Sequence, residues 1–311
     1  MRVTANTFPQ SLVDQLSSLA TRQNQLQNQA ATGQRIHLPE DDPTAIRRTL
    51  DWQSDGRAET QYRQNIDRLG ELAQANYQVM KGLKTISDRA SELAIQADGT
   101  KSPEQLKTYG IEVTQLLRQA VQLANTQFRG GYLLGGTRSD QAPFVLSGNA
   151  NGQVTDVTYQ GNAGTAESEV AQGVTLAAGS LGANSTGAGP RGLITDTRFG
   201  ADFFKHLISL QDNLNAGNTA AITSITQPDL LKDEDNLVLH FGISGTLQAR
   251  LESMRGVSQT RSDSLEVMVS REVDADLAQT LVQLNQTQTA YQAALQSGAT
   301  ILSKSLLDYI R

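Results

Sequence analysis

Apolar residues recur at alternating three- and four-residue intervals at both ends of the chain, and this spacing restricts what those ends can become. Near the start, the apolar row is interrupted only by Gln23 and consists of Leu12, Leu16, Leu19, Leu26 and Ala30. Near the end, the same spacing connects Leu277, Leu281, Leu284, Tyr291, Leu295 and Leu302. Such narrow rows are typical of coiled-coil seams. We therefore expect helices over 10–33 and 275–309 that pair with each other.

The segment after the first helix reads as a turn. Gly33 ends the apolar row, and glycine is common just past a helix C-terminus. The following residues include two prolines and the pair Asp41-Asp42. Asp42 is placed to cap the next helix and Pro43 to occupy its first position. A much longer helical pattern then runs over 44–97 and stops at an Asp-Gly pair.

Further helices are expected at 103–128 and 202–216, and another over 244–272 after an acidic stretch at 229–236. Between them the composition changes. Residues 154–159 alternate as a half-buried strand does, and 179–192 are rich in glycine and serine and are expected to form a flexible loop. The sequence thus predicts a mainly α protein, a long coiled-coil-like helical rod with its two terminal helices paired and a small β-rich insertion.

Three layers follow from this division of the chain. Residues 1–43 and 273–311 form a terminal coiled-coil layer, which we expect to be flexible in the monomer because its apolar seams are narrow. Residues 44–136 and 195–272 form the helical rod. Residues 137–194 form the β-rich outer insertion.

The composition favours a structural subunit. Apolar residues make up 38% and aromatic residues 5% of the chain, which is lean for a compact globule and suits stripes that are buried against partners. The net charge of −6 and the lack of a basic run argue against binding to nucleic acid or to a membrane surface. There is no cysteine, so disulfides and thiolate metal sites are excluded.

No residue pattern predicts catalysis. The histidines His37, His206 and His240 are scattered, so a metal site is not expected, and we expect them to be solvent-facing or only lightly buried. The glycines at 182 and 187 have the spacing of a phosphate-binding loop, but the required lysine and hydroxyl residue are missing. The acidic groups at 41–42 and 233–235 lack both a nucleophile and the ligand spacing of a calcium loop. We therefore predict a protein that is not an enzyme and has no cofactor.

Two terminal blocks resemble the bacterial flagellin superfamily. In the first, residues 29–36 and 39–45 are similar to that superfamily's N-terminal signature, a helix ending in Ala-Thr-Gly-x-Arg-Ile followed by an acidic turn. In the second, residues 290–295 and 305–310 look like its C-terminal helix, which ends in Ser-Leu-Leu-Asp. The N-terminus lacks the apolar core of a secretory signal. Export would therefore need a route that reads no cleavable signal peptide.

Within the superfamily, the resemblance is stronger to the hook–filament junction proteins than to flagellin, the bulk filament subunit. The Asp-Asp-Pro at 41–43 and the glycine-rich block at 128–137, followed by Pro143-Phe144, are similar to the junction family. Flagellins typically have Lys-Asp-Asp-Ala-Ala-Gly at the turn. Gly135 departs from the junction pattern, and little after residue 180 matches it. Flagellin therefore stays as an alternative. A coiled-coil scaffold or chaperone, or a phage-tail or secretion-needle component, ranks lower.

The resemblance implies a structural subunit that couples hook and filament. Its partners would be other copies of itself, a hook-associated protein on the hook side, flagellin on the filament side, and an export chaperone on the C-terminal helix. It would leave the cell through the flagellar export channel and reside in the extracellular flagellum. The expected assembly interface consists of Leu12, Leu16, Leu19, Leu26, Leu277, Leu281, Leu284, Tyr291, Leu295, Leu302, Leu306 and Leu307. The expected interlayer turn consists of Arg35, Ile36, Asp41, Asp42 and Pro43.

Overall fold

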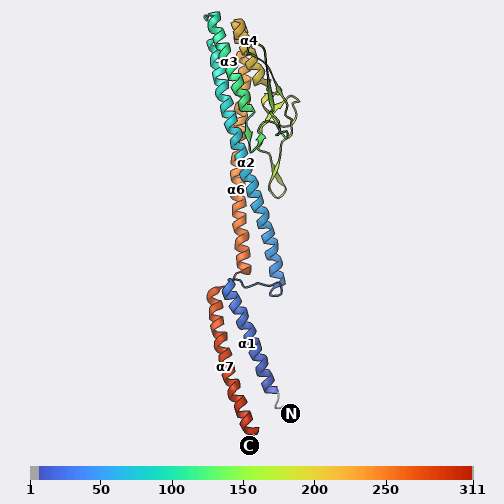
Figure 1. Ribbon diagram of the computed structural model, residues 1–311, viewed down its shortest axis with the longest axis vertical. Helices are drawn as coiled ribbons and strands as arrows, with labels where there is room; N and C mark the ends of the chain where they lie inside the picture. The colour runs from blue at the N-terminus through green and yellow to red at the C-terminus, as the bar shows by residue number, and fades with distance from the viewer. Residues whose placement is uncertain (1–6, 310–311) are drawn as a thin grey trace. The chain divides into compact units, whose positions relative to one another are not determined.

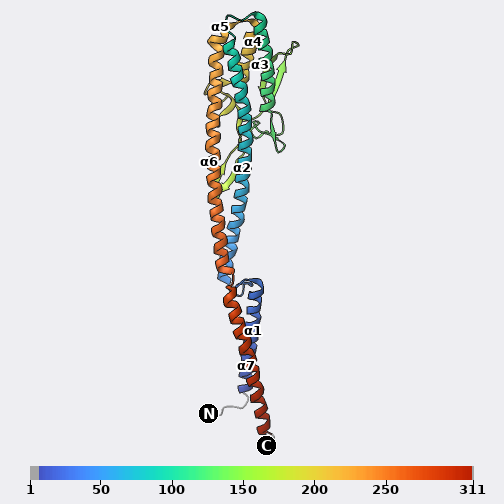
Figure 2. The same ribbon diagram turned by 90° about the vertical axis from the view of Figure 1, so that its left-hand side faces the viewer.

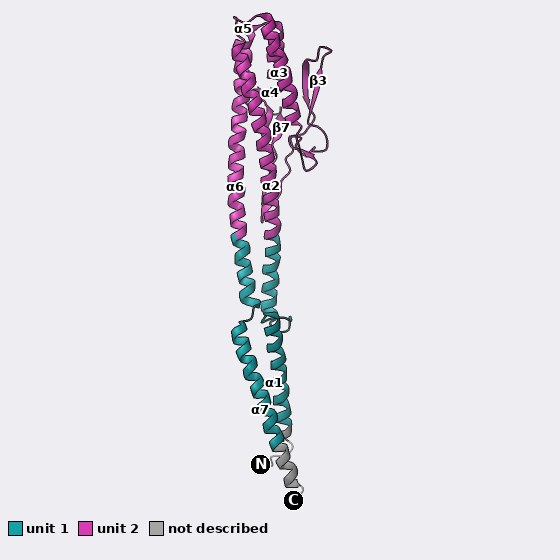
Figure 3. Cartoon of the chain, turned by 60° about the vertical axis from the view of Figure 1, so that its left-hand side comes forward, with its two compact units in different colours: residues 1–58, 260–311 teal, residues 59–259 magenta. Residues whose placement is uncertain are grey.

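The computed structural model describes the backbone of residues 7–309 and the side chains of residues 10–300. The chain divides into two compact units (Figure 3). Unit 1 comprises residues 1–58 and 260–311, and unit 2 comprises residues 59–259. The mainly α class with a small β-rich part is confirmed.

Unit 1 is built from helices. Helices α1 (Thr7–Thr32) and α7 (Leu277–Tyr309) lie side by side (Figures 1 and 2). The predicted pairing of the terminal helices is therefore confirmed. The unit also contains the first residues of α2 (Pro43–Gln96) and the last residues of α6 (Gln227–Val273).

Unit 2 combines the remaining parts of α2 and α6 with α3 (Pro103–Ala124) and α4 (Phe203–Ala216). Local sequence sets the helix ends. Ser102 caps α3 in a reciprocal pair with Gln105, and Pro103 follows at the first helical position. Asp202 caps α4, which ends at Gly217 in the left-handed conformation with a φ of 69°. The short α5 (Thr219–Ala221) and the π-helix η1 (Ile222–Thr226) then lead into α6.

The prediction that the acidic stretch at 229–236 precedes the helix over 244–272 was wrong. Helix α6 begins at Gln227 and includes it. Acidic side chains near a helix N-terminus are favoured by the helix dipole, so the charge run does not break the helix. Helix α3 also ends earlier than predicted, at Ala124, where Asn125 and Thr126 bond back to its last turn.

Nine short strands lie between residues 127 and 202, a wider span than 137–194. Three antiparallel pairs are formed by β1 (Gln127–Phe128) with β2 (Gly131–Tyr132), β3 (Phe144–Gly148) with β4 (Val154–Tyr159), and β5 (Ser168–Ala171) with β6 (Val174–Leu176). A three-stranded sheet contains β7 (Leu181–Asn184), β8 (Gly192–Asp196) and β9 (Ala201–Asp202).

The segment at 179–192 is not a loop throughout, as the sequence predicted. Strand β7 and the start of β8 lie in it, and the two strands are parallel. The connection between them is organised by Asn184, whose amide donates to the carbonyls of Ala188 and Pro190 and accepts from Thr186 and Gly187. One side chain thus satisfies the backbone of a tight turn that glycine and serine content alone does not reveal.

The main core of unit 2 lies between its helices and the inner sides of the strands. Its largest fully buried side chains are Met80, Leu83, Leu93, Leu117, Leu134, Leu193, Ile194, Phe203, Leu207, Leu210 and Leu214. Helix side-chain amides also fix the strands. The Asn125 amide donates to the Phe144 carbonyl at 2.7 Å and accepts from its N–H at 3.0 Å. The Asn236 amide donates to the carbonyls of Gly192 and Leu193.

Candidate assembly surfaces

The row of α1 that the sequence predicted as a seam is the less exposed side of that helix. Leu26 is buried and Leu12, Leu16 and Leu19 are half-buried, whereas their polar neighbours are exposed. Gln23 and Ala30, at the same spacing, are also half-buried. Unit 1 therefore uses the expected apolar row of α1 for packing against α7.

Helix α7 divides its apolar residues between two sides. The side with low exposure follows heptad spacing and contains Thr280, Leu284, Thr287, Tyr291, Ala294 and Gly298. Leu281 and Leu295 lie outside that row, Leu277 continues it at the N-terminal end of the helix, and all three are roughly half exposed. Thus only Leu284 and Tyr291 of the described C-terminal candidates lie on the packed side. Leu302, Leu306 and Leu307 lie outside the residues whose side chains the structure describes.

The expected interlayer turn is held by two aspartates. The Asp41 carboxylate accepts from the N–H groups of His37 and Leu38 at 3.0 and 2.9 Å. The Asp42 carboxylate accepts from the N–H groups of Thr44 and Ala45, and Pro43 is the first residue of α2. These donors stabilise the carboxylate forms, so the pKa of Asp41 and the pKa of Asp42 both lie below their usual value.

This turn pairs with the break between α6 and α7, which the sequence did not indicate. The N–H of Arg35 donates to the Val273 carbonyl, and the N–H of Ala275 donates to the Gly33 carbonyl. Glu272 interacts with two arginine side chains. Its backbone carbonyl accepts a hydrogen bond from the Arg35 guanidinium at 2.7 Å, and its carboxylate forms an ion pair with Arg48. Two helix breaks that are far apart in sequence therefore form one small hydrogen-bonded platform.

Ile36 is the apolar anchor of the same platform. It is buried, while Arg35, Asp41 and Pro43 are exposed and Asp42 is half-buried. The left-handed φ of 72° at Gly33 allows the chain to leave α1 sharply. The five predicted turn residues thus lie together in unit 1.

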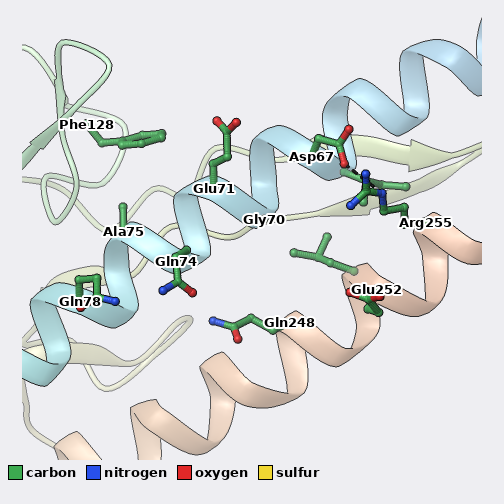
Figure 4. A pocket seen from close by; sticks show the side chains of 12 residues that line it. Asp67, Gly70, Glu71, Gln74, Ala75, Gln78, Phe128, Gln248, Glu252 and Arg255 are labelled. Carbon is green, nitrogen blue, oxygen red and sulfur yellow. Dashed lines mark ion pairs between the residues drawn. The ribbon is translucent and has the colours of Figure 1, made fainter.

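Unit 2 contains an open groove that the sequence did not reveal (Figure 4). It has a volume of about 830 Å³ and lies between α2 and α6 beside Phe128. Polar groups on its walls come from Asp67, Glu71, Gln74, Gln78, Gln248, Glu252 and Arg255, and Ile66 and Leu251 are among the apolar residues. An ion pair between Asp67 Oδ1 of α2 and Arg255 Nε of α6, 3.4 Å apart, lies at this groove.

The groove offers amide and carboxylate groups but no nucleophile with a base. The buried Gln248 Nε2 has no hydrogen-bond partner among the described residues. Within the part of the chain that the structure describes, no group of three metal-ligating side chains gathers.

Two histidines are less accessible than predicted. The His206 ring bonds to the buried Asp233 carboxylate at 2.8 Å, and Asp233 also accepts from the Asp202 N–H. His240 is buried, and its Nε2 donates to the Gly192 carbonyl at 3.1 Å. Burial lowers the pKa of His240. The expectation of solvent-facing or lightly buried histidines was therefore wrong for both, because His206 of α4 lies against Asp233 of α6, and His240 of α6 lies against Gly192 of β8.

Among residues 7–309, no helix combines the length and apolar character that crossing a membrane requires. No curated protein sequence is significantly similar to the chain. A family profile, the bacterial flagellin N-terminal helical region, matches residues 3–139.

Solved structures of flagellar proteins share the fold. A flagellar hook-associated protein of Vibrio parahaemolyticus is 17% identical with a TM-score of 0.64, over 75% of this chain and 100% of that one. FlgL of Bacillus cereus is 18% identical with a TM-score of 0.53, over 71% and 99% of the two chains. FlgL of Xanthomonas campestris is 15% identical with a TM-score of 0.56, over 69% and 98%. Residues 3–139 are thus similar to the N-terminal helical region of bacterial flagellin, and the chain shares its fold with the solved flagellar hook-associated proteins.

Proposed function

We propose that the chain is a structural subunit of the bacterial flagellum that forms the junction between hook and filament. The observation that carries this proposal is the unpartnered apolar side of α7. Leu277, Leu281 and Leu295 are roughly half exposed although α7 already packs against α1. Apolar side chains left in water along a paired helix favour burial against a further helix.

Assembly would supply that helix from neighbouring subunits. In this proposal the terminal layer of residues 1–43 and 273–311 lines the axial structure, the helical layer surrounds it, and the β-rich part lies outside. The partners would be other copies of the chain, a hook-associated protein on one side and flagellin on the other. Before assembly, an export chaperone would cover the C-terminal helix during passage through the flagellar export channel.

The platform between Gly33 and Ala275 would fix the angle between the terminal layer and the next one. Its hydrogen bonds and the two contacts of Glu272 join both helix breaks. A subunit that transmits rotation needs such a joint to hold one geometry. The chain would act in this way as a mechanical coupler and would catalyse no reaction.

The test is complementation of a strain that lacks the gene. Without the protein, we expect hooks that bear no filament and filament protein released into the medium. The variant Leu281→Asp/Leu295→Asp should be exported and folded but should fail to restore filaments, because charges would replace the exposed apolar row. The control Ala278→Asp/Ala299→Asp adds the same two negative charges at exposed residues of α7 that are not large and apolar, and it should restore filament growth.

Flagellin is the second candidate, because the matching profile describes flagellin itself. The same strain distinguishes the two functions. If the chain were the bulk filament subunit, its loss would remove the filament without releasing any other filament protein. Filaments of normal length in the deletion strain would contradict both functions.

A further inference from the structure

Helix α6 has a second row at heptad spacing on the side away from its core. The core row contains Leu230, Asp233, Leu237, His240 and Ser244, all buried. The outer row contains Leu231, Asp235, Val238, Gly242, Gly245 and Ala249, all exposed. Leu231 and Val238 are 59% and 53% exposed. In Figure 2, α6 forms an outer edge of unit 2. We call these six residues the outer row.

The two glycines of the outer row are not required by unit 2 itself. A Cβ on Gly242 or on Gly245 would meet no atom within 4 Å. Neither residue has a positive φ, and each lies inside a long helix. Glycine is the least favourable residue after proline in a helix interior. Their small size would allow another backbone to approach this side of α6.

The order of large and small residues identifies an occupant. If a second α6 lies antiparallel across the first, with the two-fold axis near residue 240, the outer row meets itself. Leu231 then faces Ala249, Val238 faces Gly242, and Asp235 faces Gly245. Each larger side chain lies opposite a small one, which is the complementarity that close helix packing needs. A parallel copy in the same register would place Val238 on Val238 and glycine on glycine.

The charges favour the same arrangement. Among the exposed charges of α6, Asp235 lies in the first part of the helix and Arg250 in the second, whereas Asp233 is buried and Arg255 lines the groove against α2. An antiparallel contact brings the first part of each helix to the second part of the other. Asp235 and Arg250 are both exposed, and neither forms an ion pair with a described residue.

We propose that two copies of the chain associate through the outer rows of their α6 helices as an antiparallel, two-fold dimer. A two-fold contact uses the same patch on both copies and closes on itself, so it does not extend into a filament. The dimer is therefore a form of the unassembled subunit and does not depend on the flagellar role. One helix pair buries little area by the standard of stable dimers, so the dimer dissociates readily on dilution.

The experiment measures self-association of the full-length chain by sedimentation equilibrium over a wide concentration range. We expect a reversible monomer–dimer equilibrium. Gly242→Leu fills the space needed by the second helix, and it should weaken association at least about tenfold while leaving the helical content and thermal unfolding intact. The control Gly56→Leu makes the same change in α2, also where a Cβ would meet no atom within 4 Å, and should leave association unchanged.

Cross-linking tests the register. Because the chain has no cysteine, a mixture of Val238→Cys and Gly242→Cys chains should form a mixed disulfide under mild oxidation. A mixture of Leu231→Cys and Gly242→Cys chains should not, because these positions lie well over one helical turn apart across the proposed contact. A chain that stays monomeric at all concentrations would overturn the proposal. So would a dimer that survives Gly242→Leu, or one that links Leu231→Cys to Gly242→Cys as readily as Val238→Cys.

Discussion

Leu12 of α1 lies directly on Gly298 of α7. A Cβ placed on Gly298 would come within 2.6 Å of Leu12 Cδ2, closer than real carbon atoms approach. Gly298 therefore provides the hole into which the Leu12 side chain fits, in the manner of knobs-into-holes packing. The contact joins two residues from opposite ends of the chain, and both belong to the heptad rows through which α1 and α7 pack.

This contact predicts a size limit at position 298. Gly298→Ala should be tolerated, because the end of the Leu12 side chain can rotate away and alanine is favoured over glycine in a helix by about 1 kcal/mol. Gly298→Leu should separate α1 from α7, at a cost of about 1–3 kcal/mol for overpacking. Amide hydrogen exchange in both helices should then accelerate. Ala299→Leu, at the exposed neighbouring position, is the control, and equal acceleration there would contradict the role of Gly298.

The cap of α2 gives a second prediction. Asp42→Ala removes the acceptor for the N–H groups of Thr44 and Ala45, so unit 1 should unfold at a lower temperature. Asp42→Asn should retain the cap, since asparagine caps as well as aspartate does. The folded-state pKa of Asp42 is lowered, so its contribution is present above the unfolded pKa and is lost as the pH falls through the folded pKa.

The measurement is thermal unfolding of the three chains between pH 2 and pH 7. The acid-dependent difference should be present in the wild type and absent in Asp42→Asn. Glu40→Ala, a charge change in the same exposed turn, should behave as the wild type. If Asp42→Ala unfolds at a lower temperature, as predicted, and filament growth also fails at a temperature where the variant is still folded, the turn sets the angle between layers as well as capping the helix.

The helices could be predicted because their signal is local. The apolar row from Leu12 to Ala30, the proline at 43 and the Ser102-Pro103 start each act within a few residues of themselves. The contacts that join the turn at Gly33 to the break at Ala275 could not be predicted in this way, since they are backbone hydrogen bonds between segments more than two hundred residues apart. Backbone pairing of this kind leaves no side-chain pattern in the sequence.

The division of α7 into a packed and an exposed side shows a second limit. Leu281 and Leu284 are equally apolar and three residues apart, yet one is exposed and the other half-buried. The row that packs also contains Thr280, Thr287 and Gly298, which hydrophobicity does not mark. The spacing predicted that α7 pairs, but the choice of side depends on the fit to α1. The same reasoning applies to Asn125, Gln211 and Asn236, whose polar side chains hold strands in place by hydrogen bonds.

Gln211 gives the third prediction, because it is fully buried and joins three elements. Its Oε1 accepts from the Val154 N–H and from the Thr114 hydroxyl, and its Nε2 donates to the Val154 carbonyl. Gln211→Leu leaves all three groups buried without this partner and should destabilise unit 2 by about 2–3 kcal/mol. Denaturant unfolding of the full-length chain measures the loss. The exposed Gln115→Leu on α3 is the control, and similar losses in both would contradict an anchoring role.

The pair of His206 and Asp233 gives the last prediction. Burial raises the pKa of Asp233 to about 6, despite the hydrogen bond from His206. For His206, burial acts in the opposite direction and lowers the pKa. The hydrogen bond to Asp233 and the charges of Asp233, Asp229 and Asp202 outweigh burial, so the pKa of His206 is raised. Each group binds its proton more tightly in the folded chain than in the unfolded one. Stability should therefore fall as the pH rises, first from about 4 to 6 for Asp233 and then through the folded pKa of His206.

The free energy of unfolding, measured in denaturant from pH 5 to pH 9, checks this sign. His206→Leu leaves a buried carboxylate without its hydrogen bond to His206 and should cost about 3 kcal/mol at pH 8. The cost should shrink toward pH 5, where Asp233 takes up a proton and loses its charge. His206→Leu should also remove the decline of stability above pH 6.5 that His206 causes. His37→Leu, at an exposed site in unit 1, should leave the pH profile unchanged. A wild-type chain whose stability rises from pH 6 to pH 8 would show that the carboxylate in this pair is held charged, with its pKa lowered by His206, and that burial is the weaker influence.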